Sequence, residues 1–205
     1  MRHFLVGLLS LVGALAIALP ASAQDFPKTP DPVPVTVDPE HTALLVLDFV
    51  DTLCPPNPTC IEAAGHVSPL LAWARTEGLF VAHTVGGGGT PIAELAPIAG
   101  EPVIEGRSDK FLNTALDQVL RDKGITTLII TGFAANGAVL YTSFEANARG
   151  YTVIVADDGM AAAAPVQMYV ARYQLLNQPG LGNPTNEPLR PRAVTLSRSD
   201  LISTR

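Results

Sequence analysis

Residues 127–142 read TLIITGFAANGAVLYT. The run at 127–130 has the apolar composition of a strand buried inside a sheet, and small residues then lead into a stretch that suits a helix. A strand, a tight turn and a helix in this order are where many α/β enzymes hold a nucleophile. Here the turn carries Ala138, with no Ser, Cys or His beside it. The stretch is therefore a site that has lost its nucleophile, a site that never needed one, or a turn with a structural role alone.

Strand and helix patterns alternate along the rest of the chain. Apolar runs at 42–48, 79–85, 127–131 and 151–156 predict buried strands, and residues 193–196 predict a late one. Helices are expected at 61–76 with a break near Ser68–Pro69, after a cap at Asn113 or Thr114, at 137–149 and at 165–176. Residues 90–109 are expected to form a long surface excursion. The alternation predicts an α/β fold whose parallel sheet is covered by helices on both faces.

Polar residues gather where these strands end. In such a sheet the site forms outside the carboxyl ends of the strands. This rule places Asp48, the segment 83–89, the turn at 133–138 and the pair Asp157–Asp158 at one edge. Asp48 closes an apolar run, so burial would raise the pKa of its carboxyl group and suit it to acid/base chemistry. A carboxylate that caps a helix or anchors a loop is the alternative.

Other polar residues near this edge have simpler interpretations. His83 lies inside its strand and is expected to be a core histidine, while the glycines at 86–89 suggest a flexible loop rather than a phosphate cradle. Lys110 is either a surface charge or, if it points toward Asp48, a partner for that carboxylate. No two histidines have the spacing of metal ligands, so we expect no metal and no cofactor.

The start of the chain predicts export. Residues 1–23 combine a basic start, an apolar run and the small-residue signature at 21–23, which together indicate a secretory signal peptide. Residues 24–40 are rich in Pro and Asp and are expected to form an extended arm, followed by one domain at 41–205. The mature chain would be periplasmic or secreted, with no segment that spans a membrane. In that oxidising compartment we expect a disulfide between Cys54 and Cys60.

The charge balance argues against polyanionic partners. The net charge is −6, it becomes −7 when Arg2 is lost with the signal peptide, and no run of Lys and Arg is present. Nucleic acid and anionic lipid are therefore not expected as partners.

Three stretches in a fixed order make the chain similar to a known family. They read TALLVLDFVDTLC at 42–54, KFLNTALDQVLRDKG at 110–124, and ITTLIITGFAANGAVLYTSFEANARGYTVIVADDGMAA at 125–162. In these stretches the chain resembles the isochorismatase-like hydrolases, the cysteine hydrolases that include nicotinamidases and N-carbamoyl amidohydrolases. The resemblance implies a three-layer α/β/α sandwich with a mainly parallel, Rossmann-like sheet. It also implies a small-molecule substrate and assembly into homo-oligomers.

The resemblance assigns roles to individual residues. Asp48 matches the family's catalytic aspartate, and Ala138 falls where the cysteine enzymes carry their nucleophile. A cis peptide bond is implied at Phe133–Ala134. The backbone of that turn, together with Asn136 and Gly137, would bind an oxyanion or a carboxylate of the substrate.

Two departures from the family pattern limit the mechanism. An alanine methyl group cannot attack a substrate, so Ala138 excludes the thioester route. The family lysine falls on Glu105, which leaves Lys110 as the best available amine and Arg107 as the other cation close by. Thiol-free family members carry Gly in place of Cys and cleave a vinyl ether.

Two hypotheses follow from this pattern. The first is an exported hydrolase in which Asp48 acts as acid and base, with Lys110 as its electrostatic partner and no thiol nucleophile. The alternative is a non-catalytic protein that keeps the pocket in order to bind a small molecule or another protein.

Overall fold

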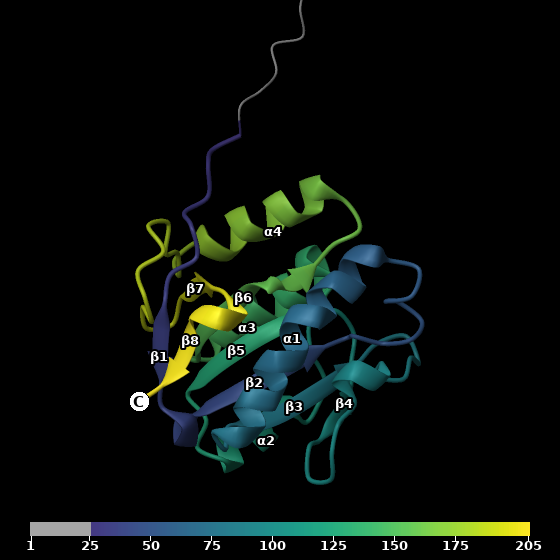
Figure 1. Cartoon of the computed structure of the whole chain (residues 1–205). Helices are drawn as coiled ribbons and strands as arrows, with labels where there is room; N and C mark the ends of the chain where they lie inside the picture. Colours follow the sequence, from purple (N-terminus) through teal and green to yellow (C-terminus); the bar gives the residue numbers. More distant parts are fainter. Residues whose placement is uncertain (1–25) are drawn as a thin grey trace, which may run out of the picture.

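The computed structural model describes residues 26–205, and the expected signal peptide therefore lies outside the described residues. A six-stranded parallel sheet in the order β4-β3-β2-β5-β6-β7 forms the middle of the domain (Figure 1). A separate parallel pair joins the two ends of the described chain. The strands of the large sheet are β2 Thr42–Leu47, β3 Phe80–Val85, β4 Val103–Glu105, β5 Thr127–Phe133, β6 Thr152–Ala161 and β7 Val194–Ser197, and the pair consists of β1 Val35–Val37 and β8 Ile202–Thr204.

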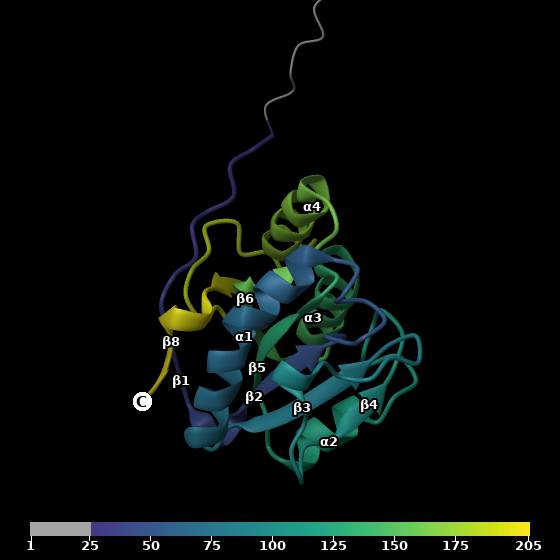
Figure 2. The same ribbon diagram turned by 45° about the vertical axis from the view of Figure 1, so that its right-hand side comes forward.

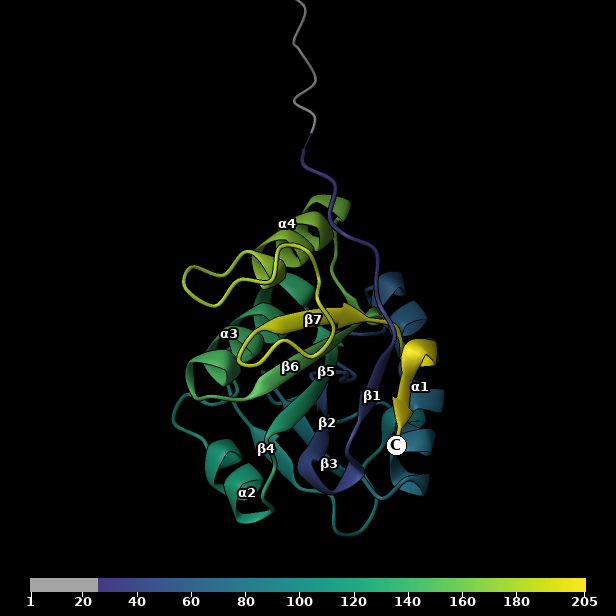
Figure 3. The same cartoon turned by 90° about the vertical axis from the view of Figure 1, so that its left-hand side faces the viewer.

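Helices cover both faces of the large sheet, which gives the expected α/β/α sandwich. They are α1 Pro58–Thr76, α2 Leu116–Asp122, α3 Leu140–Ala148 and α4 Pro165–Leu176. The helix α1 and the β1–β8 pair lie on one face, and α2, α3 and α4 lie on the other (Figure 3). Along β2 the side chains alternate between two cores, with Leu45 packed among the second group of helices and Leu44 against α1. This double burial explains the unbroken apolar run at 42–47.

Three of the predicted boundaries were wrong, and one of them is the end of the strand expected at 151–156, which continues as β6 to Ala161. The helix α1 continues through Pro69, where a break was expected. The buried side chains of Val67, Leu70 and Leu71 flank this proline and hold the helix against the sheet, which outweighs the lost backbone hydrogen bond. The excursion at 90–109 contains the edge strand β4, which pairs with β3 (Figure 2). Only Ile104 of β4 is buried, so the sequence there lacks an apolar run.

The expected N-terminal arm runs extended past α4 and β7 before it forms β1 (Figure 3). Val33 donates a backbone hydrogen bond to Leu196 in β7, and the Tyr169 hydroxyl of α4 donates one to the Pro27 carbonyl. The arm therefore covers part of the edge of β7 that would otherwise be open. Among residues 26–205, no helix is both long and apolar enough to cross a membrane.

Candidate active site

Asp48 is the first residue after β2, and the fold holds it from two sides. Its φ angle of 56° lies in the left-handed region, which turns the chain sharply away from the strand. The Asp48 amide donates to the Thr84 carbonyl at 3.1 Å, and the Thr84 hydroxyl donates to Asp48 Oδ1 at 3.1 Å. Only 6% of Asp48 is exposed. A carboxylate at the end of a central strand is thus buried and fixed in direction.

Lys110 supplies the positive charge opposite this carboxylate. Its Nζ atom lies 2.6 Å from Asp48 Oδ2 and 3.4 Å from the Gly106 carbonyl oxygen, and the residue is fully buried. Its backbone is held by two threonines: the Lys110 amide donates to Thr142 Oγ1 at 3.2 Å, and the Thr114 hydroxyl donates to the Lys110 carbonyl at 2.5 Å. Lys110 is therefore a partner for the Asp48 carboxylate and not a surface charge.

Burial and pairing act in opposite directions on the Asp48 carboxyl group. Burial raises the pKa of Asp48, whereas the hydrogen bond and charge of Lys110 and the hydrogen bond from Thr84 lower it. Burial is the larger effect, and the pKa of Asp48 lies above its ordinary value. A carboxyl group of this kind can exchange a proton closer to neutral pH than an exposed aspartate can.

The turn that carries Ala138 follows β5. Gly132 of β5 pairs with Leu47, the residue before Asp48, so β5 ends beside the end of β2. The peptide bond between Phe133 and Ala134 is cis, at the position that the resemblance indicates. A π-helical turn at Ala135–Val139 then leads into α3. Ala138, the position that the resemblance indicates for a nucleophile, is 4% exposed and presents only a methyl group.

The glycine segment after β3 packs closely against Asp48. A Cβ atom on Gly86 would lie 3.1 Å from Asp48 Oδ2, and one on Gly89 would lie 2.6 Å from Val50 Cγ2. The amide of Thr90 donates to Asp51 Oδ1 at 2.9 Å, which ties this segment to the loop after Asp48. The glycines at 86 and 89 therefore allow a close approach that a side chain would prevent.

Several polar residues that the sequence placed near this edge lie elsewhere. Asp157 pairs with Arg172, with Nη2–Oδ2 at 2.7 Å, and Asp158 accepts bonds from the Ser199 amide and hydroxyl. The prediction that these two acids follow the end of their strand was wrong: both lie inside β6, where Arg172 of α4 pairs with Asp157 and Ser199 of the C-terminal segment donates to Asp158. Glu105 and Arg107, the two other positions weighed for the cation, are both exposed.

His83 is a core histidine, as predicted. It is 1% exposed, and its Nε2 atom lies 2.9 Å from Glu101, which also binds Arg75 through two bonds. Burial lowers the pKa of His83, so the neutral ring donates to the Glu101 carboxylate. This cluster fastens the excursion before β4 to α1 and β3.

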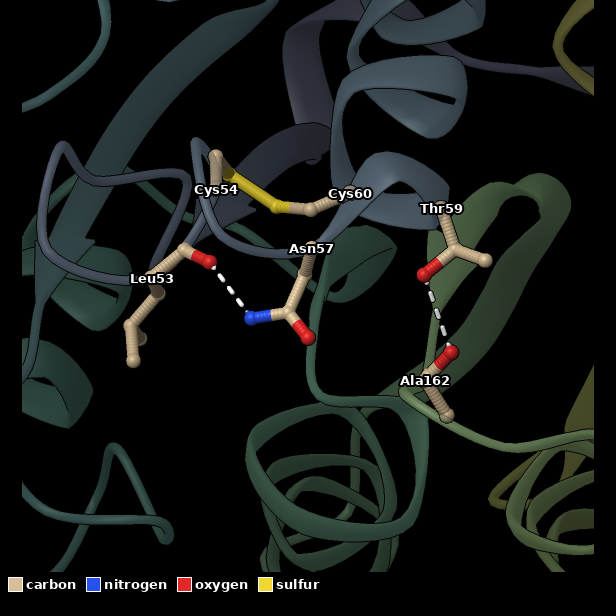
Figure 4. Close-up of a disulfide and its surroundings, with 6 residues drawn as sticks. All are labelled: Leu53, Cys54, Asn57, Thr59, Cys60 and Ala162. Atoms are coloured by element: carbon tan, nitrogen blue, oxygen red, sulfur yellow. Dashed lines mark hydrogen bonds between the residues drawn. A yellow bond between two sulfur atoms is a disulfide. The ribbon is translucent and has the colours of Figure 1, made fainter.

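The expected disulfide is present between Cys54 and Cys60 (Figure 4). Both cysteines are fully buried. Close to the bond, the Asn57 side chain donates to the Leu53 carbonyl at 2.7 Å and the Thr59 hydroxyl donates to the Ala162 carbonyl at 3.0 Å. These links fix the loop after Asp48 to the start of α1 and to the end of β6.

Comparison with known proteins identifies the family. The model of the isochorismatase domain matches residues 42–184, which is well over half of the chain. The protein belongs to the isochorismatase family. Its sequence is 34% identical over 119 residues to the ureidoacrylate amidohydrolase RutB of Yersinia enterocolitica, over 53% of this chain and 52% of that protein. The matched segments span between 30% and 52% of the length of such curated relatives.

Solved structures of the isochorismatase family share the fold. A cysteine hydrolase from Pseudomonas syringae pv. phaseolicola superimposes with a TM-score of 0.70 at 20% identity, over 84% of this chain and 95% of that chain. The N-carbamoylsarcosine amidase of Thermoplasma acidophilum superimposes with a TM-score of 0.65 at 24% identity, over 78% of this chain and 96% of that chain. At these identities the likeness concerns the fold alone.

Sequence reasoning missed Thr84 and the role of Gly86. One signal was available, because a parallel neighbour of the 42–47 strand must place its last residues beside Asp48. Thr84 pairs with Leu47 in the sheet and is a polar residue at the end of a buried strand. The direction of its hydroxyl group depends on the turn at Asp48 and does not follow from the strand pattern.

Proposed function

We propose that this isochorismatase-family protein is an exported hydrolase that acts on a small molecule through Asp48, without a covalent thiol intermediate. The observation that carries the proposal is the buried pair of Asp48 Oδ2 and Lys110 Nζ at 2.6 Å. A buried ion pair is a weak source of stability, because removing both charges from water costs as much as their attraction returns. A buried carboxylate–amine pair is instead typical of sites that carry out acid/base chemistry.

In the proposed reaction, water attacks the electrophilic atom of the substrate directly. Asp48 takes the proton of that water as the new bond forms, and it returns the proton to the leaving group as the old bond breaks. Lys110 stabilises the ionised carboxylate and limits the rise of its pKa caused by burial. The backbone of the turn at 133–138, together with Asn136 and Gly137, binds the oxygen on which negative charge develops. Ala138 leaves room for the substrate and takes no part in bond making.

The relatives suggest which compounds to test first. RutB acts on ureidoacrylate and the Thermoplasma protein on N-carbamoylsarcosine, as their names state. We propose a substrate panel of small ureido and N-carbamoyl compounds, simple amides, vinyl ethers and small cyclic compounds. Wild-type protein and Asp48→Asn should be assayed side by side. Turnover by the wild type that the variant loses supports the proposal, and equal inactivity of both proteins across the panel removes the catalytic claim.

One observation favours the alternative of a non-catalytic binder, namely the methyl group at Ala138. A binder of small molecules would be stabilised by its ligand through mass action, without turnover. Thermal-shift measurements on the same panel separate the two functions. A compound that raises the melting temperature and is recovered unchanged supports binding, whereas a compound that is consumed supports catalysis.

The proposal of export rests on the leader pattern at 1–23 and on the Cys54–Cys60 disulfide. Expression of the full chain in a bacterium, followed by fractionation and N-terminal sequencing, tests it. A mature protein that begins at Gln24 in the periplasm or the medium is the expected result. Full-length protein retained in the cytoplasm would contradict export.

We also propose that the protein forms homo-oligomers through the outer face of α3 and α4. Val166, Val170 and Tyr173 follow one another along α4 at helical spacing and are 38–58% exposed. Beside them, Tyr141 and Phe144 of α3 border a hollow of about 550 Å³. A two-fold axis across α4 would place Val166 and Val170 of each copy in the hollow of the other copy.

Light scattering after size-exclusion chromatography tests this interface. Val170→Asp should convert the oligomer into a monomer, whereas Val103→Asp on the far edge strand should leave its mass unchanged. A wild-type protein that is monomeric at high concentration would rule out the oligomer.

A further inference from the structure

Among the described residues, Thr84 is the only one that hydrogen-bonds to Asp48 through both its backbone and its side chain. Its carbonyl accepts from the Asp48 amide, and its hydroxyl donates to Asp48 Oδ1, both at 3.1 Å. Thr84 is 2% exposed, and it lies in β3 opposite Leu47. The neighbouring His83 pairs with Glu101, so its ring is committed to a different cluster.

The two oxygens of Asp48 consequently have different partners. Oδ1 accepts from the neutral hydroxyl of Thr84, and Oδ2 accepts from the charged amine of Lys110. Gly86 brings its backbone close to the Oδ2 side, where a Cβ atom would be 3.1 Å away. A carboxylate with a single partner could rotate and exchange its oxygens, whereas partners on both sides hold its plane.

We propose that Thr84 is a positioning residue for Asp48: its hydroxyl holds Oδ1, so that Oδ2 beside Lys110 is the oxygen that exchanges the proton. This role rests on the proposed function, since it assigns a proton to one oxygen of the same carboxylate. Thr84 itself does not touch the reacting atoms. Its hydrogen bond fixes the orientation of the Asp48 carboxylate, with Oδ2 toward Lys110, and stabilises the ionised form of Asp48.

A merely structural role for Thr84 makes a different prediction. A β-branched residue at this place fits the strand and fills the core, and valine would do so equally well. The hydroxyl would then be dispensable, and its removal would leave the titration of Asp48 unchanged. The charged group that faces Asp48 from its packed neighbours is Lys110, and it is kept in every variant of the test.

The test compares Thr84→Val, Thr84→Ser and the matched control Thr131→Val. Thr131 is a fully buried threonine of β5, the strand on the other side of β2 from Thr84, and its hydroxyl donates to the Leu45 carbonyl at 3.1 Å rather than to Asp48. Carbon-13 NMR of the aspartate carboxyl groups, with Asp48 assigned from the signal lost in Asp48→Asn, follows the titration without any substrate. We expect Thr84→Val to move the Asp48 midpoint to higher pH, and Thr84→Ser and Thr131→Val to leave it in place.

An unchanged Asp48 midpoint in Thr84→Val overturns the proposal, as does an equal shift in Thr131→Val. If Thr84→Val fails to fold, Thr84→Ser against Thr84→Ala gives the same comparison, because only the serine keeps the hydroxyl. On a compound that the wild type hydrolyses, Thr84→Val should lower kcat by about tenfold with little change in KM. This is the effect expected from the loss of one hydrogen bond. If Asp48→Asn keeps full activity, the proposed function fails, while the NMR result on Thr84 still stands.

Discussion

Lys110 reaches Asp48 from 62 residues away in the sequence, and its Nζ atom lies 2.6 Å from Asp48 Oδ2. The lysine comes from the segment before α2, whereas Glu105, the position that the sequence resemblance indicates for a lysine, is an exposed residue of the edge strand β4. In this chain Lys110 supplies the positive charge beside the carboxylate.

The stability of this pair can be measured by a double-mutant cycle. Lys110→Met leaves the buried carboxylate of Asp48 without compensation, and we expect a loss of about 3–5 kcal/mol in the free energy of unfolding. Asp48→Asn leaves the amine alone and should also destabilise the protein. The double variant has no buried charge, so it should be more stable than the sum of the single losses by about 1–3 kcal/mol. Urea denaturation gives these values, and strictly additive losses would show that the two groups do not interact.

Gly86 should be sensitive to a single added methyl group. A Cβ atom there would lie 3.1 Å from Asp48 Oδ2 and 3.4 Å from its Cγ, so Gly86→Ala must displace the carboxyl group. We expect a loss of about 1–3 kcal/mol in unfolding free energy. The control is Gly65→Ala in α1, where nothing lies within 4 Å of the added atom and a gain of about 0.5–1 kcal/mol is expected. Equal effects of the two substitutions would contradict the close packing around Asp48.

The cluster of His83, Glu101 and Arg75 predicts a loss of stability in acid. Burial would raise the pKa of Glu101, but the hydrogen bonds from Arg75, the Ile98 amide and His83 outweigh it and bring the pKa to about 2. Because the folded pKa is below the unfolded one, Glu101 stabilises the protein above pH 4.5, and this is lost as the pH falls toward about 2. His83, whose pKa is lowered by burial, acts in the same direction below pH 6.5.

Unfolding free energies of the wild type and Glu101→Gln across this acid range measure the effect. The wild type should lose about 2–3 kcal/mol more than the variant between pH 4.5 and pH 2. The raised pKa of Asp48 has the opposite effect on stability, because ionisation of this carboxyl group opposes folding. This contribution is the same in both proteins and cancels in the comparison. Parallel curves for the two proteins would mean that Glu101 is not held in its ionised form.

Ala138→Cys should show whether the turn can still present a nucleophile. A thiol in the turn that leads into α3 is expected to have a lowered pKa and would attack amides and N-carbamoyl compounds. We expect amide hydrolysis above the level of the wild type, and iodoacetamide should abolish this gain. Ala148→Cys, at an exposed position of the same helix, should be alkylated without gaining activity. If Ala138→Cys is also inactive while folded, the site lacks more than its thiol.

The sequence was informative wherever one residue type decided the structure. The doubly buried strand at 42–47, the helix that begins at Pro165 and the two cysteines of one short loop all gave correct predictions. Their signals are local, because apolar runs, a proline at a helix start and neighbouring thiols need no distant partner. The inward direction of Lys110 could only be stated as a condition, since it depends on Thr142 and Thr114, which hold its backbone.

Other features depended on partners far along the chain and were missed or misplaced. The strands β1, β4 and β8 are three residues long, and their pairing is visible only in the folded sheet. Asp157 and Asp158 come directly after the apolar run at 151–156, just as Asp48 follows the run at 42–47, but the strand β6 continues through them to Ala161. Arg172 pairs with Asp157 and Ser199 donates to Asp158, and no pattern in the sequence indicates these contacts.

In the proposed mechanism, Asp48 performs the chemistry without a thiol. The most direct measurement is kcat/KM of the wild type and Asp48→Asn on the fastest compound of the panel, followed across about pH 5–9. We expect a wild-type activity that iodoacetamide does not affect, with a fall of about 100-fold or more in kcat/KM of the variant. A variant within about twofold of the wild type, a difference of less than 0.5 kcal/mol in transition-state stabilisation, would contradict the claim.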